Sequence, residues 1–133
     1  MIDLHALPDE PGAYQLVLYL AEEVSLRVGA LGTFRFPVGR YVYTGSALGG
    51  LRARLARHLR KDKRLRWHID YLLQHAVVED IRLFRTRERI ECAINQQTLV
   101  QSHAQVIARG FGSSDCRCPT HLVYLQHWSE AFV

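Results

Sequence analysis

The chain has 133 residues, of which 48% are hydrophobic and 23% charged, and this composition excludes a disordered or fibrous protein. We predict a single domain over residues 1–133, which is long enough to bury its own core. The net charge of +4 is modest, and the apolar runs are too short to cross a bilayer, so we expect no membrane contact.

The N-terminus and the cysteines predict the compartment. Residues 1–5 contain no basic region followed by an apolar stretch, so we expect no secretory signal. The three cysteines are an odd number, and Cys116 and Cys118 are too close in sequence for an easy disulfide. These features favour a soluble, cytoplasmic protein in a reducing compartment.

The first third of the chain is typical of β-structure, because apolar and polar residues alternate between glycine-containing turns. These strands should form an antiparallel meander of two or three main strands with one added hairpin. The predicted strands cover residues 13–20, 24–28, 33–36 and 40–44.

Helices follow a glycine-containing loop at residues 45–50. The first is predicted from Leu51 to about Arg60, with a buried stripe of Leu51, Leu55 and Leu59. The second covers residues 67–75, and the residues expected to face inward are Ile69, Leu72, Leu73 and Ala76.

The C-terminal part is predicted to add a strand over residues 77–84, which Glu79-Asp80 can break. A longer helix from about Glu88 to Arg109 should end at Gly110. A loop over residues 113–120 and a short apolar segment over residues 122–125 complete the chain. The fold class is therefore α/β (α+β), with a small, mainly antiparallel sheet flanked by helices.

Basic residues are concentrated between Leu51 and Trp67, where Asp62 is the only acid. Such a concentration indicates a polyanion partner, although a run of charge is also typical of a solvated helix face. The basic residues of this segment are Arg52, Arg54, Arg57, Arg60, Lys61, Lys63, Arg64 and Arg66.

Two short strings precede and follow the strand-rich region, namely Gly12-Ala13-Tyr14 and Tyr43-Thr44-Gly45. After them come Leu51-x-x-Arg54-Leu55-x-x-His58 and an acidic residue on a later helix. In this order they resemble the GIY-YIG nuclease superfamily. Either string alone would be uninformative, since tyrosine is common in strands.

Two further strings resemble one small stand-alone branch of that superfamily. They are Trp-His-Ile-Asp-Tyr at residues 67–71 and Gly-Phe-Gly-Ser-Ser-Asp-Cys-x-Cys at residues 110–118. The resemblance covers nearly the whole chain. It implies the GIY-YIG fold with an added β-hairpin and an endonuclease, a hydrolase of DNA phosphodiester bonds. Members of the branch occur fused to a base-excision glycosylase, which implies DNA repair or processing and a repair-protein partner.

The resemblance also implies catalytic roles. Tyr14 and Tyr43 match the two motif tyrosines, one of which orients or deprotonates the attacking water. Arg54 matches the arginine that faces the scissile phosphate, and His58 stands where the family has His or Tyr. Glu91 matches the single carboxylate that holds one divalent metal, expected to be magnesium or manganese.

The chemistry of these residues is compatible with the implied roles. Arg54 and His58 lie about 40° apart on a helix, at the edge of the leucine stripe. Arginine binds phosphate through two parallel hydrogen bonds, whereas a tyrosine base needs nearby positive charge to ionise. Glu88 is the alternative to Glu91, and either carboxylate could instead pair with arginines on a solvated surface.

Other residues are predicted to contact the substrate, which we expect to be DNA, with RNA as an alternative. The segment at residues 67–71 offers His68, and less favourably Asp70, as a further catalytic group, unless it is simply a packed helix start. Ser46 replaces the usual lysine after the second motif, and the usual asparagine has no clear match. The predicted nucleic-acid contacts are Gly45, Ser46, Arg52, Arg57, Arg60, Lys61, Lys63 and Arg64.

A cysteine-rich segment near the end of the chain has three possible interpretations. Cys116, Cys118 and His121 are soft ligands that suit zinc, with His103 or Asp115 as the fourth ligand, but only half of a usual zinc motif is visible. The alternatives are a loop that closes over the active site and a thiol pair open to oxidation. Cys92 is interpreted as a buried helical residue.

We therefore predict a metal-dependent endonuclease that cleaves DNA phosphodiester bonds. Two alternatives remain open at this stage. One is a nucleic-acid-binding module that keeps the fold without catalysis. The other is a zinc-stabilised interaction domain whose basic surface binds RNA or protein.

Overall fold

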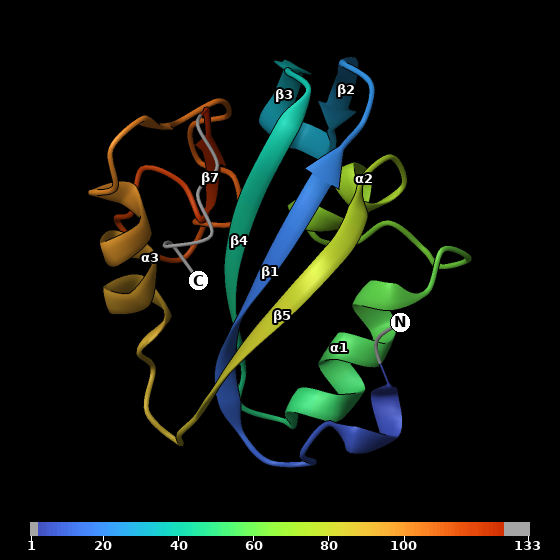
Figure 1. Cartoon of the computed structure of the whole chain (residues 1–133), viewed down its shortest axis with the longest axis vertical. Coiled ribbons are helices and arrows are strands. Elements are labelled where there is room, and N and C mark those ends of the chain that lie inside the picture. The colour runs from blue at the N-terminus through green and yellow to red at the C-terminus, as the bar shows by residue number, and fades with distance from the viewer. Residues whose placement is uncertain (1–2, 127–133) are drawn as a thin grey trace.

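A five-stranded antiparallel sheet forms the centre of the molecule, in the order β5-β1-β4-β7-β6 (Figure 1). The computed structural model describes residues 3–126, so the ends of the domain predicted over residues 1–133 lie outside the described residues. The strands of this sheet are β1 (Gly12–Leu20), β4 (Gly39–Ala47), β5 (Val77–Arg85), β6 (Ala104–Gln105) and β7 (Leu122–Leu125).

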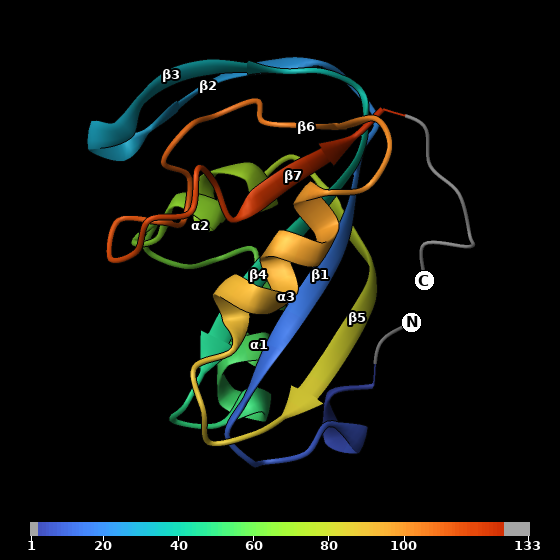
Figure 2. The same cartoon turned by 90° about the vertical axis from the view of Figure 1, so that its left-hand side faces the viewer.

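Within residues 3–126, the remaining elements are a separate hairpin, three α-helices and two short 3₁₀ turns. The helices cover both faces of the sheet, with α1 and α2 on one face and α3 on the other (Figures 1 and 2). Their bounds are β2 (Val24–Val28), β3 (Gly32–Phe36), α1 (Leu51–Leu59), α2 (His68–Leu73), α3 (Glu91–Leu99), η1 (Leu4–Ala6) and η2 (Gly29–Leu31).

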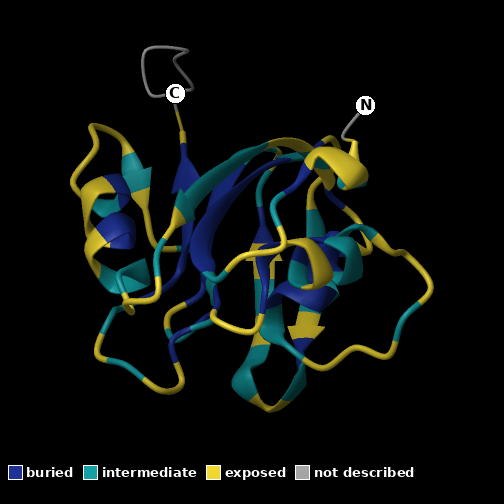
Figure 3. Ribbon diagram, turned by 90° about the horizontal axis from the view of Figure 1, so that it is seen from below, coloured by how far each residue is buried: buried dark blue, intermediate teal, exposed yellow. Residues whose placement is uncertain are grey.

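Strand β1 lies between β5 and β4 inside the sheet and is buried along almost its whole length (Figure 3). Its side chains alternate between the two faces of the sheet. Tyr14, Leu16 and Leu18 join the core that includes Leu51 and Leu55 of α1. Gln15 points the other way and donates a hydrogen bond of 2.9 Å to Thr98 of α3. Because both faces are covered, the strand is rich in apolar residues rather than strictly alternating.

The predicted fold class is confirmed, and most predicted strands lie where the pattern places them. The hairpin of β2 and β3 is separate from the main sheet, as the added hairpin of the prediction requires. Strand β4 continues three residues beyond the prediction and includes Gly45, Ser46 and Ala47. Strand β5 is continuous, and the break expected at Glu79-Asp80 is only a shift of register opposite Val17 and Leu18.

The long helix predicted from Glu88 to Arg109 is wrong in length, because α3 ends at Leu99. The chain turns at His103, which has a φ of 67°, and Ala104 then pairs with Leu125. Sheet pairing therefore outweighs the weak helical preference of the polar residues after Leu99. The nine residues of α1 and of α3 make these the longest helices within residues 3–126, and no helix there has the length and apolarity of a membrane span.

Helix α1 departs from the predicted stripe in one respect that matters for the site. Leu51 and Leu55 are buried as expected, but the third buried residue is His58, while Leu59 is half-buried. The structure thus places an imidazole in the position that the periodicity assigns to a leucine. The inward positions predicted for the second helix are all buried, at Ile69, Leu72, Leu73 and Ala76.

Candidate active site and an adjacent cysteine-histidine cluster

One polar cleft brings together residues from both motif strands and from helices α1 and α3. It consists of two adjoining hollows of about 280 and 360 Å³ that share Tyr43, Arg54, Gly112 and Asp115. The first hollow also contains Glu91, and the second contains the side chains of Tyr14, His58, Trp67 and His68. We call this continuous hollow the cleft.

Tyr14 and His58 form a hydrogen-bonded pair at its floor. The Tyr14 hydroxyl lies 2.6 Å from His58 Nε2, and both side chains are almost fully buried. Burial raises the pKa of Tyr14 to about 12, although Arg54 opposes the shift. Burial, together with Lys63, lowers the pKa of His58 to about 3. At neutral pH both groups are therefore uncharged, and in the imidazole tautomer protonated at Nδ1 the phenol donates its proton to the Nε2 lone pair.

Gly45 makes room for this pair. It lies directly opposite Tyr14 in the pairing of β1 with β4. A Cβ atom at Gly45 would lie 2.6 Å from Tyr14 Cζ and would overlap the hydroxyl oxygen. The second motif therefore needs glycine because the phenol of the first motif crosses β4 at this point.

Tyr43 and Arg54 lie between the two hollows. The Tyr43 ring centroid is 6.4 Å from that of Tyr14. Burial, reinforced by the neighbouring Tyr14 phenol, raises the pKa of Tyr43 well above its usual value, so its hydroxyl stays protonated. Arg54 donates a 2.7 Å hydrogen bond to the Ser46 carbonyl, and its guanidinium lies over the Trp67 ring, 4.5 Å from the ring centroid. These contacts hold a cation at the side of the cleft.

A buried ion pair fixes Trp67 and α1 relative to α2. Arg57 donates two hydrogen bonds of 2.9 Å to the fully buried carboxylate of Asp70 and also lies over the Trp67 ring. The backbone amides of Arg66 and Trp67 donate to the same carboxylate, each at 2.8 Å. Although burial opposes ionisation, these donors lower the pKa of Asp70 to about 2. Asp70 is therefore a structural anchor beneath the cleft.

Glu91 begins α3 and lines the cleft, whereas Glu88 lies on the exposed turn before this helix. One carboxylate oxygen of Glu91, Oε2, is buried and has no hydrogen-bond partner. A buried anionic oxygen without a partner is costly unless a cation or a donor satisfies it. Glu91 therefore fits a divalent cation, which also prefers oxygen ligands.

His68 lines the same cleft, but its ring is held by the backbone. Its Nδ1 accepts a 2.8 Å hydrogen bond from the amide of Gly112, which has a left-handed φ of 69°. This contact leaves Nε2 as the ring nitrogen that can act on a ligand. The structure thus brings Tyr14, Tyr43, Arg54, His58, His68 and Glu91 to one place, while their catalytic roles stay a prediction.

The predicted nucleic-acid contacts fall into two groups. Gly45 and Ser46 line the cleft, and Arg60 and Arg64 are exposed beside α1. The other four donate hydrogen bonds within the protein: Arg52 to the Leu7 carbonyl, Arg57 to Asp70, Lys61 to the Leu73 and Ala76 carbonyls, and Lys63 to the Arg57 and His58 carbonyls. Much of the basic segment therefore closes the ends of helices, which reduces its capacity to bind phosphate.

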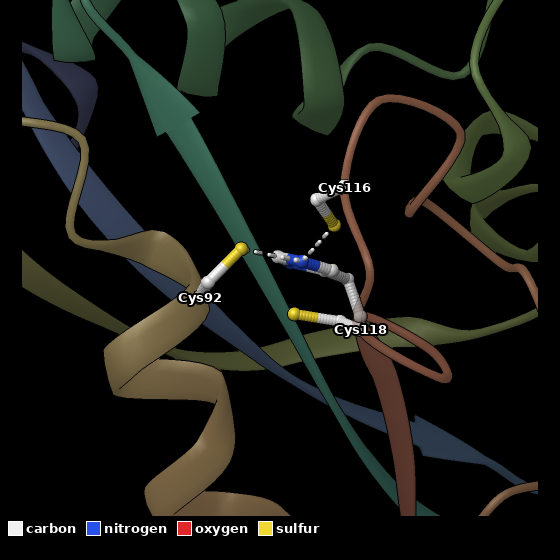
Figure 4. Close-up of side chains that lie close together, drawn as sticks. Cys92, Cys116 and Cys118 are labelled. Atoms are coloured by element: carbon white, nitrogen blue, oxygen red, sulfur yellow. Dashed lines mark hydrogen bonds between the residues drawn. The ribbon is translucent and has the colours of Figure 1, made fainter.

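Three cysteines and one histidine meet beside the cleft. One ligand atom from each of Cys92, Cys116, Cys118 and His121 lies within 4.8 Å of all the others. Figure 4 shows the three cysteine side chains converging on a common centre. All three thiols are free, and burial, together with the neighbouring thiols, raises the pKa of Cys92 to about 12. This Cys₃His cluster can hold a metal ion.

The interpretation of Cys92 as merely a buried helical residue is corrected by this geometry. It occupies the fourth corner of the cluster, the place predicted for His103 or Asp115. Neither of those two residues belongs to the cluster. The sequence offers little signal for this, because Cys92 is separated from Cys116 by more than twenty residues and has no ligand-type neighbour at the usual spacing.

Sequence comparison places the chain in a family. Residues 13–132 match the model of a family described as a domain of unknown function, DUF123. The chain belongs to the DUF123 family. No curated protein and no solved structure matches this DUF123 domain significantly.

Sequence reasoning missed three residues of this DUF123 domain besides Cys92. Arg66 and Trp67 line one side of the cleft, and Arg89 lines the other. Arg66 and Arg89 belong to runs of similar charge, so nothing in the sequence distinguishes them from their neighbours. For Trp67 the sequence offers only the alternative that residues 67–71 are a packed helix start, but its ring is the surface on which Arg54 and Arg57 lie.

Proposed function

We propose that this DUF123 domain is a GIY-YIG-type endonuclease that hydrolyses DNA phosphodiester bonds. The observation that supports it best is that Tyr14, Tyr43, Arg54, His58 and Glu91 line one cleft. The five residues come from four different elements. A role in DNA repair or processing, with a repair-protein partner, is part of this proposal and rests on the resemblance to the GIY-YIG superfamily alone.

The first step is activation of a water molecule by Tyr14 and His58. With His58 in the tautomer protonated at Nδ1, Tyr14 donates its proton to Nε2, and a lone pair of the Tyr14 oxygen is available to accept a proton from the water. As the water attacks, its proton passes to the Tyr14 oxygen and the phenol proton passes to His58. The imidazolium that results is stabilised by the negative charge of the phosphate, which compensates for its unfavourable burial.

The second requirement is stabilisation of the pentacovalent phosphorus. Arg54 is fixed by Ser46 and Trp67, so its remaining N–H groups are available to the non-bridging oxygens. Tyr43 keeps its proton and can donate a further hydrogen bond. Donors that are held in place before the reaction begins contribute more than mobile ones.

Glu91 would hold a divalent magnesium or manganese ion. When bound, such an ion supplies positive charge for the phosphate and the leaving oxygen. The buried and unpartnered Oε2 of Glu91 supports this assignment. Manganese binding, followed by its paramagnetic resonance in the absence of DNA, should be lost in Glu91→Gln and retained in Glu88→Gln.

Cleavage can be tested on nicked, branched and single-stranded DNA with magnesium or manganese. We expect Arg54→Ala to lower the single-turnover rate by about 10²–10³-fold, as removal of one preorganised donor does. Arg54→Lys should recover little of this loss, because an ammonium group cannot replace a planar guanidinium. Arg27→Ala is the matched control, since it removes the same charge from an exposed position on β2 that does not line the cleft.

The outcomes separate the candidate functions. Equal cleavage by the wild-type protein and Arg54→Ala would contradict the proposed site. Salt-sensitive binding without cleavage under any metal would identify a nucleic-acid-binding module. If RNA is cleaved and DNA is not, the substrate assignment is wrong but the chemistry stands.

A further inference from the structure

We propose that Cys92, Cys116, Cys118 and His121 bind one zinc ion, and that this ion fixes one wall of the cleft. Cys92 lies on α3, Cys116 and Cys118 lie in the segment between Gly110 and Thr120, and His121 directly precedes β7. That segment contains no helix or strand of its own, so it needs another source of order. The zinc assignment stands whether or not the cleft cleaves DNA.

The distances within the cluster suit tetrahedral coordination. His121 Nε2 lies 3.3 Å from the sulfur of Cys116 and 3.6 Å from that of Cys92. Zinc–sulfur and zinc–nitrogen bonds of about 2.3 and 2.0 Å place such atoms about 3.5 Å apart around a tetrahedral ion. His121, Cys92 and Cys116 therefore need little movement to coordinate zinc, and Cys118 lies within 4.8 Å of all three.

The opposite side of the His121 ring supports the same assignment. Its Nδ1 lies 3.0 Å from the backbone carbonyl of Thr44, which can accept a hydrogen bond only if Nδ1 carries the proton. Nε2 then presents its lone pair to the three sulfurs. A backbone carbonyl that sets the tautomer in this way is the usual neighbour of a histidine bound to zinc.

The ligand types select zinc and a structural role. Three thiolates and one imidazole are soft donors, whereas magnesium and manganese prefer oxygen. Four protein ligands also leave no open position for water or substrate, unlike a catalytic zinc site. The ion of this cluster is therefore distinct from the divalent cation assigned to Glu91.

The position of the cluster links it to the cleft. Cys92 directly follows Glu91 in the first turn of α3, and His121 is bonded to Thr44, which directly follows Tyr43. Cys116 and His121 themselves line the cleft. Zinc coordination would therefore restrain the backbone next to both Glu91 and Tyr43.

Metal analysis of the purified protein tests the assignment directly. We expect one zinc ion per chain in the wild type, loss of zinc in Cys92→Ser and retention in His103→Asn and Asp115→Asn. These two controls replace the residues that the sequence suggests as alternative fourth ligands. Cobalt replacing zinc should give the visible absorption of a tetrahedral thiolate complex, weakened when Cys118 is replaced by serine.

A second measurement covers the case in which the cysteine variants fail to fold. A chelator should remove zinc from the wild-type protein and speed hydrogen exchange of residues 110–121 and of the first turn of α3, with β1 and β5 little changed. The proposal is overturned by wild-type protein that carries no zinc and takes up no cobalt, by a disulfide between cluster cysteines, or by zinc retention in Cys92→Ser. Metal content is measured without DNA, whereas nuclease activity is measured on zinc-replete protein. Failure of the zinc proposal can therefore be distinguished from failure of the proposed nuclease function.

Discussion

Replacement of Gly45 by alanine tests how tightly the two motif strands are joined. The new Cβ would lie 2.6 Å from Tyr14 Cζ and 3.1 Å from Tyr14 Cε1, and the ring cannot retreat because it is buried against His58. Overpacking of this kind costs about 1–3 kcal/mol. If the ring moves, the buried hydrogen bond to His58 is lost as well, at about 1–3 kcal/mol.

We therefore expect Gly45→Ala to lower the free energy of unfolding by about 2–6 kcal/mol in urea denaturation. Gly49→Ala is the control, because nothing lies within 4 Å of its added methyl group, and it should change stability by less than about 0.5 kcal/mol. In a Tyr14→Leu background the clash is absent, so Gly45→Ala should cost at least about 1 kcal/mol less. An equal cost in both backgrounds would refute the reasoning.

Two further predictions concern buried ionisable groups. The pKa of His58, about 3 when folded, lies below its ordinary value, so only the unfolded chain takes up a proton as the pH falls below 6.5. The free energy of unfolding should therefore fall by up to about 1.4 kcal/mol per pH unit from pH 6.5 towards pH 4.5. His58→Gln should flatten this slope, whereas His75→Gln, at an exposed site, should not. An unchanged slope in His58→Gln would contradict the lowered pKa of His58. Asp70→Asn leaves Arg57 without its buried partner and should lower the free energy of unfolding by about 3–5 kcal/mol. Glu79→Gln, at the more exposed pair with Arg40, should lower it by less than about 1 kcal/mol. Similar losses in the two variants would show that burial of Asp70 does not matter.

Most strands could be predicted because their apolar periodicity is local. Strands β2 and β3 and the apolar segment of β7 lie where the pattern placed them, and so do the buried residues of α2. The end of α3 could not be predicted in this way. It depends on the pairing of β6 with β7, a contact between distant residues that overrides a weak helical preference.

Tyr14, Tyr43, Arg54 and His58 were accessible from sequence because each belongs to a short string with a recognisable order. Glu91 belongs to no such string, and its neighbour Glu88 was the alternative. The cluster was accessible only in part, since three of its ligands lie in one loop segment but the fourth, Cys92, comes from α3. Charge was the least informative signal. Lys61 and Lys63 resemble phosphate contacts in sequence, yet their ammonium groups bind the carbonyls at the ends of α1 and α2.

The packing of Arg54 and Arg57 on Trp67 gives the molecule an internal optical probe. The two guanidinium carbons lie 4.5 and 4.1 Å from the centroid of this indole, close enough for their charge to influence its fluorescence. A phosphate-bearing molecule that binds Arg54 should change the emission of Trp67, because it partly neutralises the charge beside the indole. With Trp128→Phe to leave a single emitter, titration of unlabelled DNA could report occupancy of the cleft even under conditions in which no bond is broken.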